Sequence, residues 1–119
     1  MQPGQEGKWS GIEQRRHKRV HLGVPVECRA GEAKIAGRAE NMSSSGLLIR
    51  AATAFGEDAE ITVSFTLPNA SSEMQCRARV AHVVPGVFMG VEFLDLSQES
   101  LALIEQYVAS NPALQAKRT

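Results

Sequence analysis

The sequence has few aromatic residues and no excess of charge of either sign. Its 119 residues include one Trp, one Tyr and four Phe, and 13 basic side chains balance 13 acidic ones. A balanced charge argues against a protein that coats DNA or an anionic membrane by bulk electrostatics. The scarcity of aromatic side chains also argues against an RNA-binding barrel that stacks bases on exposed aromatic pairs. Any anion site must therefore come from a local cluster of basic residues.

The sequence also lacks the features of disulfide-rich, zinc-binding, membrane-spanning and catalytic proteins. Cys28 and Cys76 are the only cysteines, and two cysteines supply neither a disulfide framework nor the spacing of a zinc site. We expect both to be buried, reduced thiols of a cytoplasmic protein. No apolar run is long enough to span a bilayer, and the polar residues 1–7 do not resemble a signal peptide. No nucleophile beside a base, pair of carboxylates or metal-ligand cluster is recognisable, so we do not expect an enzyme or a cofactor.

Six short segments have the pattern of β-strands. Apolar and polar residues alternate most clearly at 20–28 and 61–67, and weaker or more continuous apolar patterns occur at 33–41, 46–50, 74–84 and 87–93. Ala30-Gly31-Glu32 predicts a hairpin turn after the first strand. Pro25 lacks a backbone donor, which predicts that this strand lies at an edge or is locally irregular.

The period then changes to that of a helix. Leu101, Ile104 and Val108 form one apolar stripe with Tyr107 beside it. Asp95 or Ser97 can cap the first turn, and Asn111-Pro112 ends the helix.

Six strands followed by one helix predict a mainly β protein. The expected fold is a six-stranded antiparallel barrel whose C-terminal helix covers one opening or side. The length suits one domain, which we assign to residues 15–110. A flexible N-terminal tail at 1–14 and a C-terminal tail at 111–119 would flank it.

Two polar segments are candidates for a binding site. The first is the basic cluster at residues 15–19, just before the first strand. The second is the segment 41–46, between the second and third strands. Taken alone, the first is best interpreted as a solvated cluster and the second as a simple turn. Together they have the groups needed to hold a guanine nucleotide.

The chemistry of these groups is complementary to such a ligand. An arginine fork meets O6 and N7 of guanine at once, and a basic cluster neutralises phosphates. The amide of Asn41 can bond a base edge, and the hydroxyl of Ser43 can donate to phosphate. Gly46 lets a ligand approach the backbone and can adopt a positive φ. His82 is better explained as an exposed strand residue at the barrel rim than as a catalytic base.

The order and spacing of these residues resemble the PilZ domain, a family of bacterial receptors for the second messenger cyclic di-GMP. Arg-x-x-x-Arg is present as Arg15 and Arg19, and Asp/Asn-x-Ser-x-x-Gly as Asn41, Ser43 and Gly46. The segments Ala-Arg-Val-Ala-His-Val at 78–83 and Gly-Val-Glu-Phe-Leu-Asp-Leu at 90–96 resemble the last strands of the family and the approach to its helix. The resemblance covers about residues 13–108.

This resemblance implies a six-stranded barrel with a C-terminal helix, with the ligand lying over the outer barrel surface. Arg15 and Arg19 would contact guanine and phosphate, assisted by Arg16. Asn41 and Ser43 would fix a guanine edge and phosphate. The implied ligand-binding residues are Arg15, Arg16, Arg19, Asn41, Ser43, Gly46 and His82.

Two positions depart from the usual pattern. Position 41 is Asn, which the family allows beside Asp, but an amide has one acceptor oxygen where a carboxylate has two. We therefore expect weaker capture of guanine. His82 stands near a strand position where many family members carry a larger aromatic residue, and it could still stack on a base.

The resemblance implies a cyclic di-GMP receptor or adaptor that changes the conformation of its N-terminal segment on binding and regulates an unidentified partner protein. The alternative is a non-binding PilZ-like scaffold that acts through protein contacts alone. We expect no DNA or RNA partner, no membrane insertion, and a monomer or weak homodimer. One ligand or a stacked pair per site, and the process regulated, stay open.

Overall fold

The computed structural model describes residues 18–114. The expected N-terminal tail and two implied site residues, Arg15 and Arg16, lie outside the described residues. The elements in chain order are β1 (Val20–Ala30), β2 (Ala33–Ser43), β3 (Gly46–Arg50), β4 (Glu60–Phe65), β5 (Met74–Val84), β6 (Phe88–Leu94) and α2 (Gln98–Ser110). The predicted fold class is confirmed.

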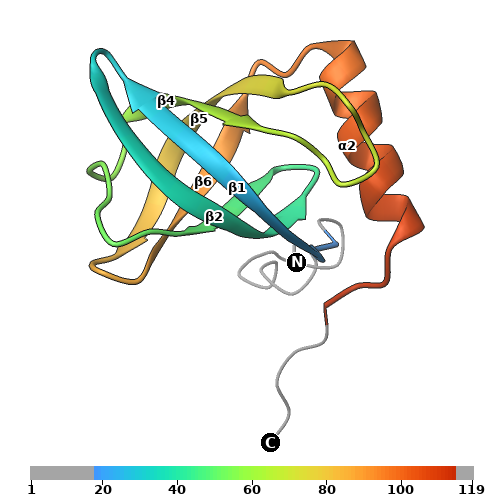
Figure 1. Ribbon diagram of the computed structural model, residues 1–119, viewed down its shortest axis with the longest axis horizontal. Coiled ribbons are helices and arrows are strands. Elements are labelled where there is room, and N and C mark those ends of the chain that lie inside the picture. Colours follow the sequence, from blue (N-terminus) through green and yellow to red (C-terminus); the bar gives the residue numbers. More distant parts are fainter. Residues whose placement is uncertain (1–17, 115–119) are drawn as a thin grey trace, which may run out of the picture.

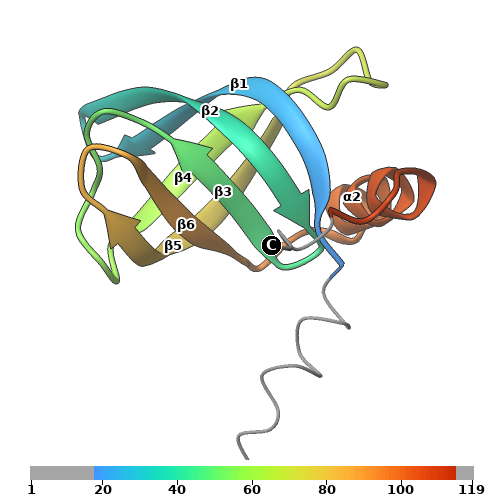
Figure 2. The same ribbon diagram turned by 90° about the horizontal axis from the view of Figure 1, so that it is seen from below.

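The six strands close into an antiparallel barrel. The order around it is β1-β2-β3-β6-β5-β4, and β4 pairs with β1 to complete the ring. Figure 2 shows β3 lying between β2 and β6 on the wall turned toward the viewer. This arrangement brings the ends of β2 and β6, which are far apart in the sequence, to either side of β3.

Pro25 lies in an irregular strand of a closed barrel and not at a free edge. The pairing of β1 with β2 shifts register between His21 and Val24, and Gly23 there has a φ of 70°. On its other side, β1 pairs with β4 only at residues 27–29. The missing N–H of Pro25 is therefore not required by the β4 ladder. Of the two alternatives that Pro25 raised, the structure shows local irregularity.

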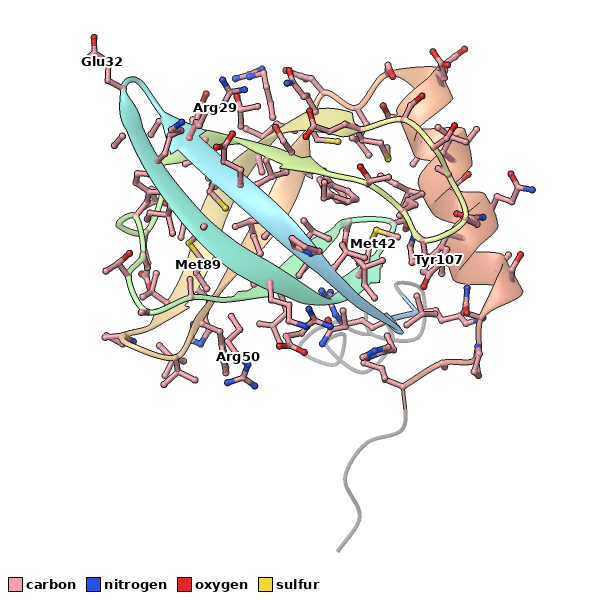
Figure 3. The ribbon with its side chains drawn as sticks, in the orientation of Figure 1. Arg29, Glu32, Met42, Arg50, Met89 and Tyr107 are labelled. Carbon is pink, nitrogen blue, oxygen red and sulfur yellow. The ribbon has the colours of Figure 1, made fainter. Side chains whose placement is uncertain are left out.

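The core fills the barrel because alternate residues of each strand point inward. Met42, Ile49 and Met89 are fully buried, and Figure 3 shows the side chains of Met42 and Met89 inside the barrel while Arg50 and Glu32 project outward. The expected burial of the first strand is confirmed, since Val20 and Cys28 are also fully buried.

Both cysteines are free and buried, as expected. Cys28 and Cys76 each lie opposite Val63, on the two strands that flank β4. Two strand spacings separate them, roughly 10 Å, which is too far for a disulfide. Burial in the apolar core raises the pKa of each thiol to about 11, with the charge of Glu27 also contributing for Cys28.

Helix α2 lies beside one end of the barrel (Figure 1). Ser97 is the N-cap, and its Oγ accepts the backbone N–H of Ser100 at 3.0 Å. Asp95 instead pairs with Arg77 at 2.6 Å. Ile104, Tyr107 and Val108 are buried, so the apolar stripe of the helix seals this end of the core. Of the two predicted caps, Ser97 is confirmed.

The chain after α2 returns to the start of β1. Ala113 forms a bridge with Val20, and the N–H of Leu114 donates to the carbonyl of Arg19 at 2.8 Å. Part of the expected C-terminal tail is thus hydrogen-bonded to the residue that precedes the barrel. Within the described part of the chain, no helix combines the length and apolar character needed to cross a membrane.

Candidate functional site

Arg19 joins the two polar segments. It directly precedes β1, and its backbone is fixed by Leu114. Its Nε donates to Asn41 Oδ1 at 2.7 Å, its Nη1 to Ser43 Oγ at 3.3 Å and its Nη2 to the carbonyl of Gly46 at 3.5 Å. One guanidinium therefore contacts all three residues of the second segment that the sequence singled out.

The charge of Arg19 is partly removed from water. Burial lowers the pKa of this arginine from its ordinary value. A guanidinium keeps its proton at neutral pH even so, because its intrinsic pKa is very high. The site thus contains a half-buried positive charge, which favours an anionic ligand.

The β2–β3 turn is held by its own serines. Ser43 lies opposite Gly46, so Ser44 and Ser45 form the turn. The Oγ of Ser43 accepts the N–H of Ser45 at 3.0 Å and lies 2.9 Å from the Oγ of Ser45. Ser43 is fully buried. With Arg19 included, its hydroxyl has three partners, so a direct bond to phosphate would require one of them to be released.

Gly46 is required by the barrel itself. A Cβ at this position would lie 2.0 Å from the carbonyl oxygen of Val91 on β6, a contact that no side chain tolerates. The described glycines with positive φ are Gly23, Gly31 and Gly86. The expectation of a positive φ at Gly46 is therefore wrong, and its missing side chain serves the close approach of β3 and β6.

Two rows of outward positions extend from Arg19 across four neighbouring strands. They follow from the pairing of β2 with β3, β3 with β6 and β6 with β5. The first row is Asn41, Leu48, Gly90 and His82, and the second is Ser43, Gly46, Glu92 and Arg79. Strands lie about 4.8 Å apart, so each row is roughly 14 Å long. That is a platform wide enough for a planar base and its neighbouring groups.

An open pocket of about 410 Å³ lies on this platform. Its polar groups come from Arg19, Asn41, Ser45 and Glu92, and its floor includes Leu48, Ala81 and Gly90. Mostly apolar clefts of this size with a few convergent polar groups are typical of small-molecule sites. Small residues in the floor leave room for a flat ligand against the strands.

The described site residues of the sequence prediction divide into two groups. Arg19, Asn41, Ser43 and Gly46 come together through the contacts above. His82 is exposed at the far end of the first row, opposite Gly90, and does not line the pocket. The register of β5 and β6 shifts between Val80 and His82, which turns Ala81 toward the pocket instead.

Seven of the ten residues that line the pocket were not predicted: Ser45, Leu47, Leu48, Ala81, Gly90, Val91 and Glu92. Ser45 could have been suspected, because it lies two residues after Ser43 in a Ser-rich turn. Leu48 and Glu92 carry no local signal. They reach the pocket because β3 lies between β2 and β6 in the closed barrel, an order that the sequence pattern does not specify.

Comparison with known proteins agrees with this fold. The closed six-stranded barrel and its C-terminal helix define a small β-barrel domain. The model of the PilZ domain family matches residues 13–110, which is most of the chain. The protein belongs to the PilZ domain family. No significant match is found among curated protein sequences.

Solved structures with similar folds are themselves distant in sequence. The chain matches the Bacillus subtilis inhibitor of motility (MotI/DgrA) with a TM-score of 0.69 and 18% identity, over 81% of this chain and 50% of that one. The PilZ domain of YcgR from Escherichia coli, solved with c-di-GMP, matches with a TM-score of 0.64 and 16% identity, over 82% and 91%. The Borreliella burgdorferi PlzA protein, in complex with c-di-GMP, matches with a TM-score of 0.62 and 15% identity, over 85% and 45%. The chain thus spans about half the length of MotI and of PlzA.

Proposed function

We propose that this protein is a cyclic di-GMP receptor that regulates a partner protein. The observation that carries the proposal is the guanidinium of Arg19, which bonds Asn41, Ser43 and Gly46 together at the edge of a pocket. Membership of the PilZ family and the presence of c-di-GMP in the structures of two similar folds support the choice of ligand.

The roles of the residues follow from their chemistry. Arg19 supplies positive charge for a phosphate and a planar fork for a guanine edge. Arg15 and Arg16 add charge from the same basic segment. The Nδ2 of Asn41, which has no partner among residues 18–114, can donate to a base, since Arg19 donates to its Oδ1. Ser43 keeps the β2–β3 turn in shape, and its hydroxyl can turn to phosphate when Nη1 of Arg19 turns to the ligand while Nε stays bonded to Asn41.

Regulation would act through the segment that carries the arginines. Arg15, Arg16 and Arg19 all precede β1, so a ligand that gathers these side chains onto the barrel changes the position of the N-terminal segment. Such a change is driven by the ligand's preference for one arrangement over the other. The altered surface would engage or release an effector protein.

Isothermal titration calorimetry with cyclic di-GMP tests the proposal. The wild type should bind, and Arg15→Ala, Arg19→Ala and Ser43→Ala should bind more weakly. Arg50→Ala is a matched control, because Arg50 is an exposed arginine on β3 that pairs with Glu40 and does not line the pocket. No binding by the wild type would favour the alternative of a non-binding scaffold. Equal losses for Arg50→Ala and Arg19→Ala would show that the site is misplaced.

A further inference from the structure

The pocket contains a carboxylate, and its negative charge would face an anionic ligand bound there. Among the described residues that line it, Glu92 is the one acid. Glu92 lies on β6 opposite Gly46 of β3. Its Oε1 accepts Nη2 of Arg79 at 2.5 Å. Arg79 holds this carboxylate from the neighbouring strand β5.

Two other acceptors of the site each already accept one hydrogen bond from Arg19. Oδ1 of Asn41 accepts from Nε of Arg19, and the carbonyl of Gly46 accepts from Nη2 of the same side chain. Arg19 itself is a donor only. A base that presents N–H donors to this pocket therefore meets Glu92 as the acceptor with the most spare capacity. A carboxylate has about four acceptor positions, of which Arg79 uses one among the described residues, whereas an amide or carbonyl oxygen has two.

Guanine and adenine differ in the edge that such a carboxylate reads. Guanine presents the N1–H and N2–H donors side by side, and a carboxylate accepts both. Adenine presents an acceptor at N1, which a carboxylate repels. A group built to hydrogen-bond one ligand rejects an analogue that lacks the matching donors, because its polar atoms are then left unpaired.

We propose that Glu92 selects guanine over adenine in this pocket and that Arg79 is its positioning residue. The inference rests on the proposed function and assigns the reading of the base to a residue outside the two polar segments. It also gives the pocket the carboxylate that Asn41 lacks. Arg79 neutralises Glu92, so the acid can remain near the phosphates without a large repulsion; both side chains are about half exposed, which screens the charges further.

The test is a pair of titrations, with cyclic di-GMP and with cyclic di-AMP, for the wild type and Glu92→Gln. The amide keeps the size of the side chain but replaces one acceptor oxygen with a donor. Glu92→Gln should lose about ten- to a hundredfold in cyclic di-GMP affinity and nothing in cyclic di-AMP affinity. Arg79→Met should lower the preference for cyclic di-GMP by a smaller factor, because Glu92 remains but is no longer held.

The control is Glu27→Gln. Glu27 pairs with Arg29 on β1 at 3.7 Å and does not line the pocket, so its replacement should leave both affinities unchanged. Unchanged or tighter binding of cyclic di-GMP by Glu92→Gln would overturn the role of Glu92. A wild type that binds no cyclic di-GMP would overturn the proposed function itself. The wild-type titration therefore distinguishes a failure of the proposed function from a failure of the role of Glu92.

Discussion

Nε of Arg19 donates a 2.7 Å hydrogen bond to Oδ1 of Asn41, which lies 22 residues later in the chain. The bond ties the start of β1 to the outer face of β2. The backbone N–H of Leu114 also donates to the backbone carbonyl of Arg19. Arg19 is therefore part of the architecture of the pocket as well as its candidate anion-binding group, and substitutions here test both roles.

Arg19→Lys should weaken cyclic di-GMP binding tenfold or more and lower the free energy of unfolding by about 1–2 kcal/mol. A lysine keeps the charge, but its single ammonium cannot reach three acceptors in the plane that a guanidinium spans. Calorimetry measures the affinity, and urea denaturation measures the stability. Arg50→Lys is the control, and equal affinity of Arg19→Lys and wild type would contradict the assigned geometry.

Asn41→Asp should tighten cyclic di-GMP binding by about tenfold. The carboxylate keeps one oxygen for Nε of Arg19 and offers the second to the N–H donors of guanine. The charged pair with Arg19 is also stronger than the present bond between an amide and a guanidinium. Calorimetry on both proteins at the same salt concentration checks this, and unchanged or weaker affinity would count against it.

Tyr107→Phe should lower the free energy of unfolding by about 0.5–1.5 kcal/mol and weaken ligand binding slightly. The hydroxyl of Tyr107 donates to the carbonyl of His21 at 3.2 Å, close to the start of β1. Its loss leaves the buried ring in place but frees the backbone that follows Arg19. Denaturation and calorimetry are the measurements. An unchanged stability would show that α2 does not hold this strand through the hydroxyl.

The two cysteines should make the protein less stable in alkaline solution. Burial raises the pKa of Cys28 and Cys76 from 9.0 to about 11, so the folded protein keeps protons that the unfolded chain releases. This contribution to stability is fully present below pH 9 and is lost as the pH rises toward about 11.

Urea midpoints measured across this pH range give the slope. The double variant Cys28→Ala and Cys76→Ala should have a lower midpoint at neutral pH, because cavities remain in the core, but a shallower decline with pH. An equally steep decline would assign the effect to other groups.

The fold could be predicted because each strand carries its own pattern. Residues 46–50 and 74–84 were expected as strands and are β3 and β5 with the same bounds. The side of each strand that faces the barrel interior needs apolar residues, and the resulting pattern can be recognised in the sequence. The β1–β2 hairpin could be predicted equally well, since Gly31 supplies the positive φ of 60° that its turn requires.

The site could be predicted only where its residues belong to the two polar segments. The need for glycine at position 46 comes from the carbonyl of Val91, which lies 45 residues away and approaches only when β3 and β6 pair. Glu92 reaches the pocket through the same pairing. The hydrogen bond from Leu114 to Arg19 joins backbone atoms only, so no pattern of side chains in the sequence predicts it. Such contacts depend on strand order and chain path, which local sequence does not encode.

The central claim is that cyclic di-GMP binds on the platform between Arg19 and Glu92, and nuclear magnetic resonance of the isotope-labelled protein tests it most directly. Titration with cyclic di-GMP should shift the backbone amide signals of Ser45, Gly46, Leu48 and Gly90 in a saturable way. Gly31 and Gly86 lie in turns at the opposite end of the barrel and should not shift (Figure 1). No shifts, or shifts confined to Gly31 and Gly86, would contradict the account.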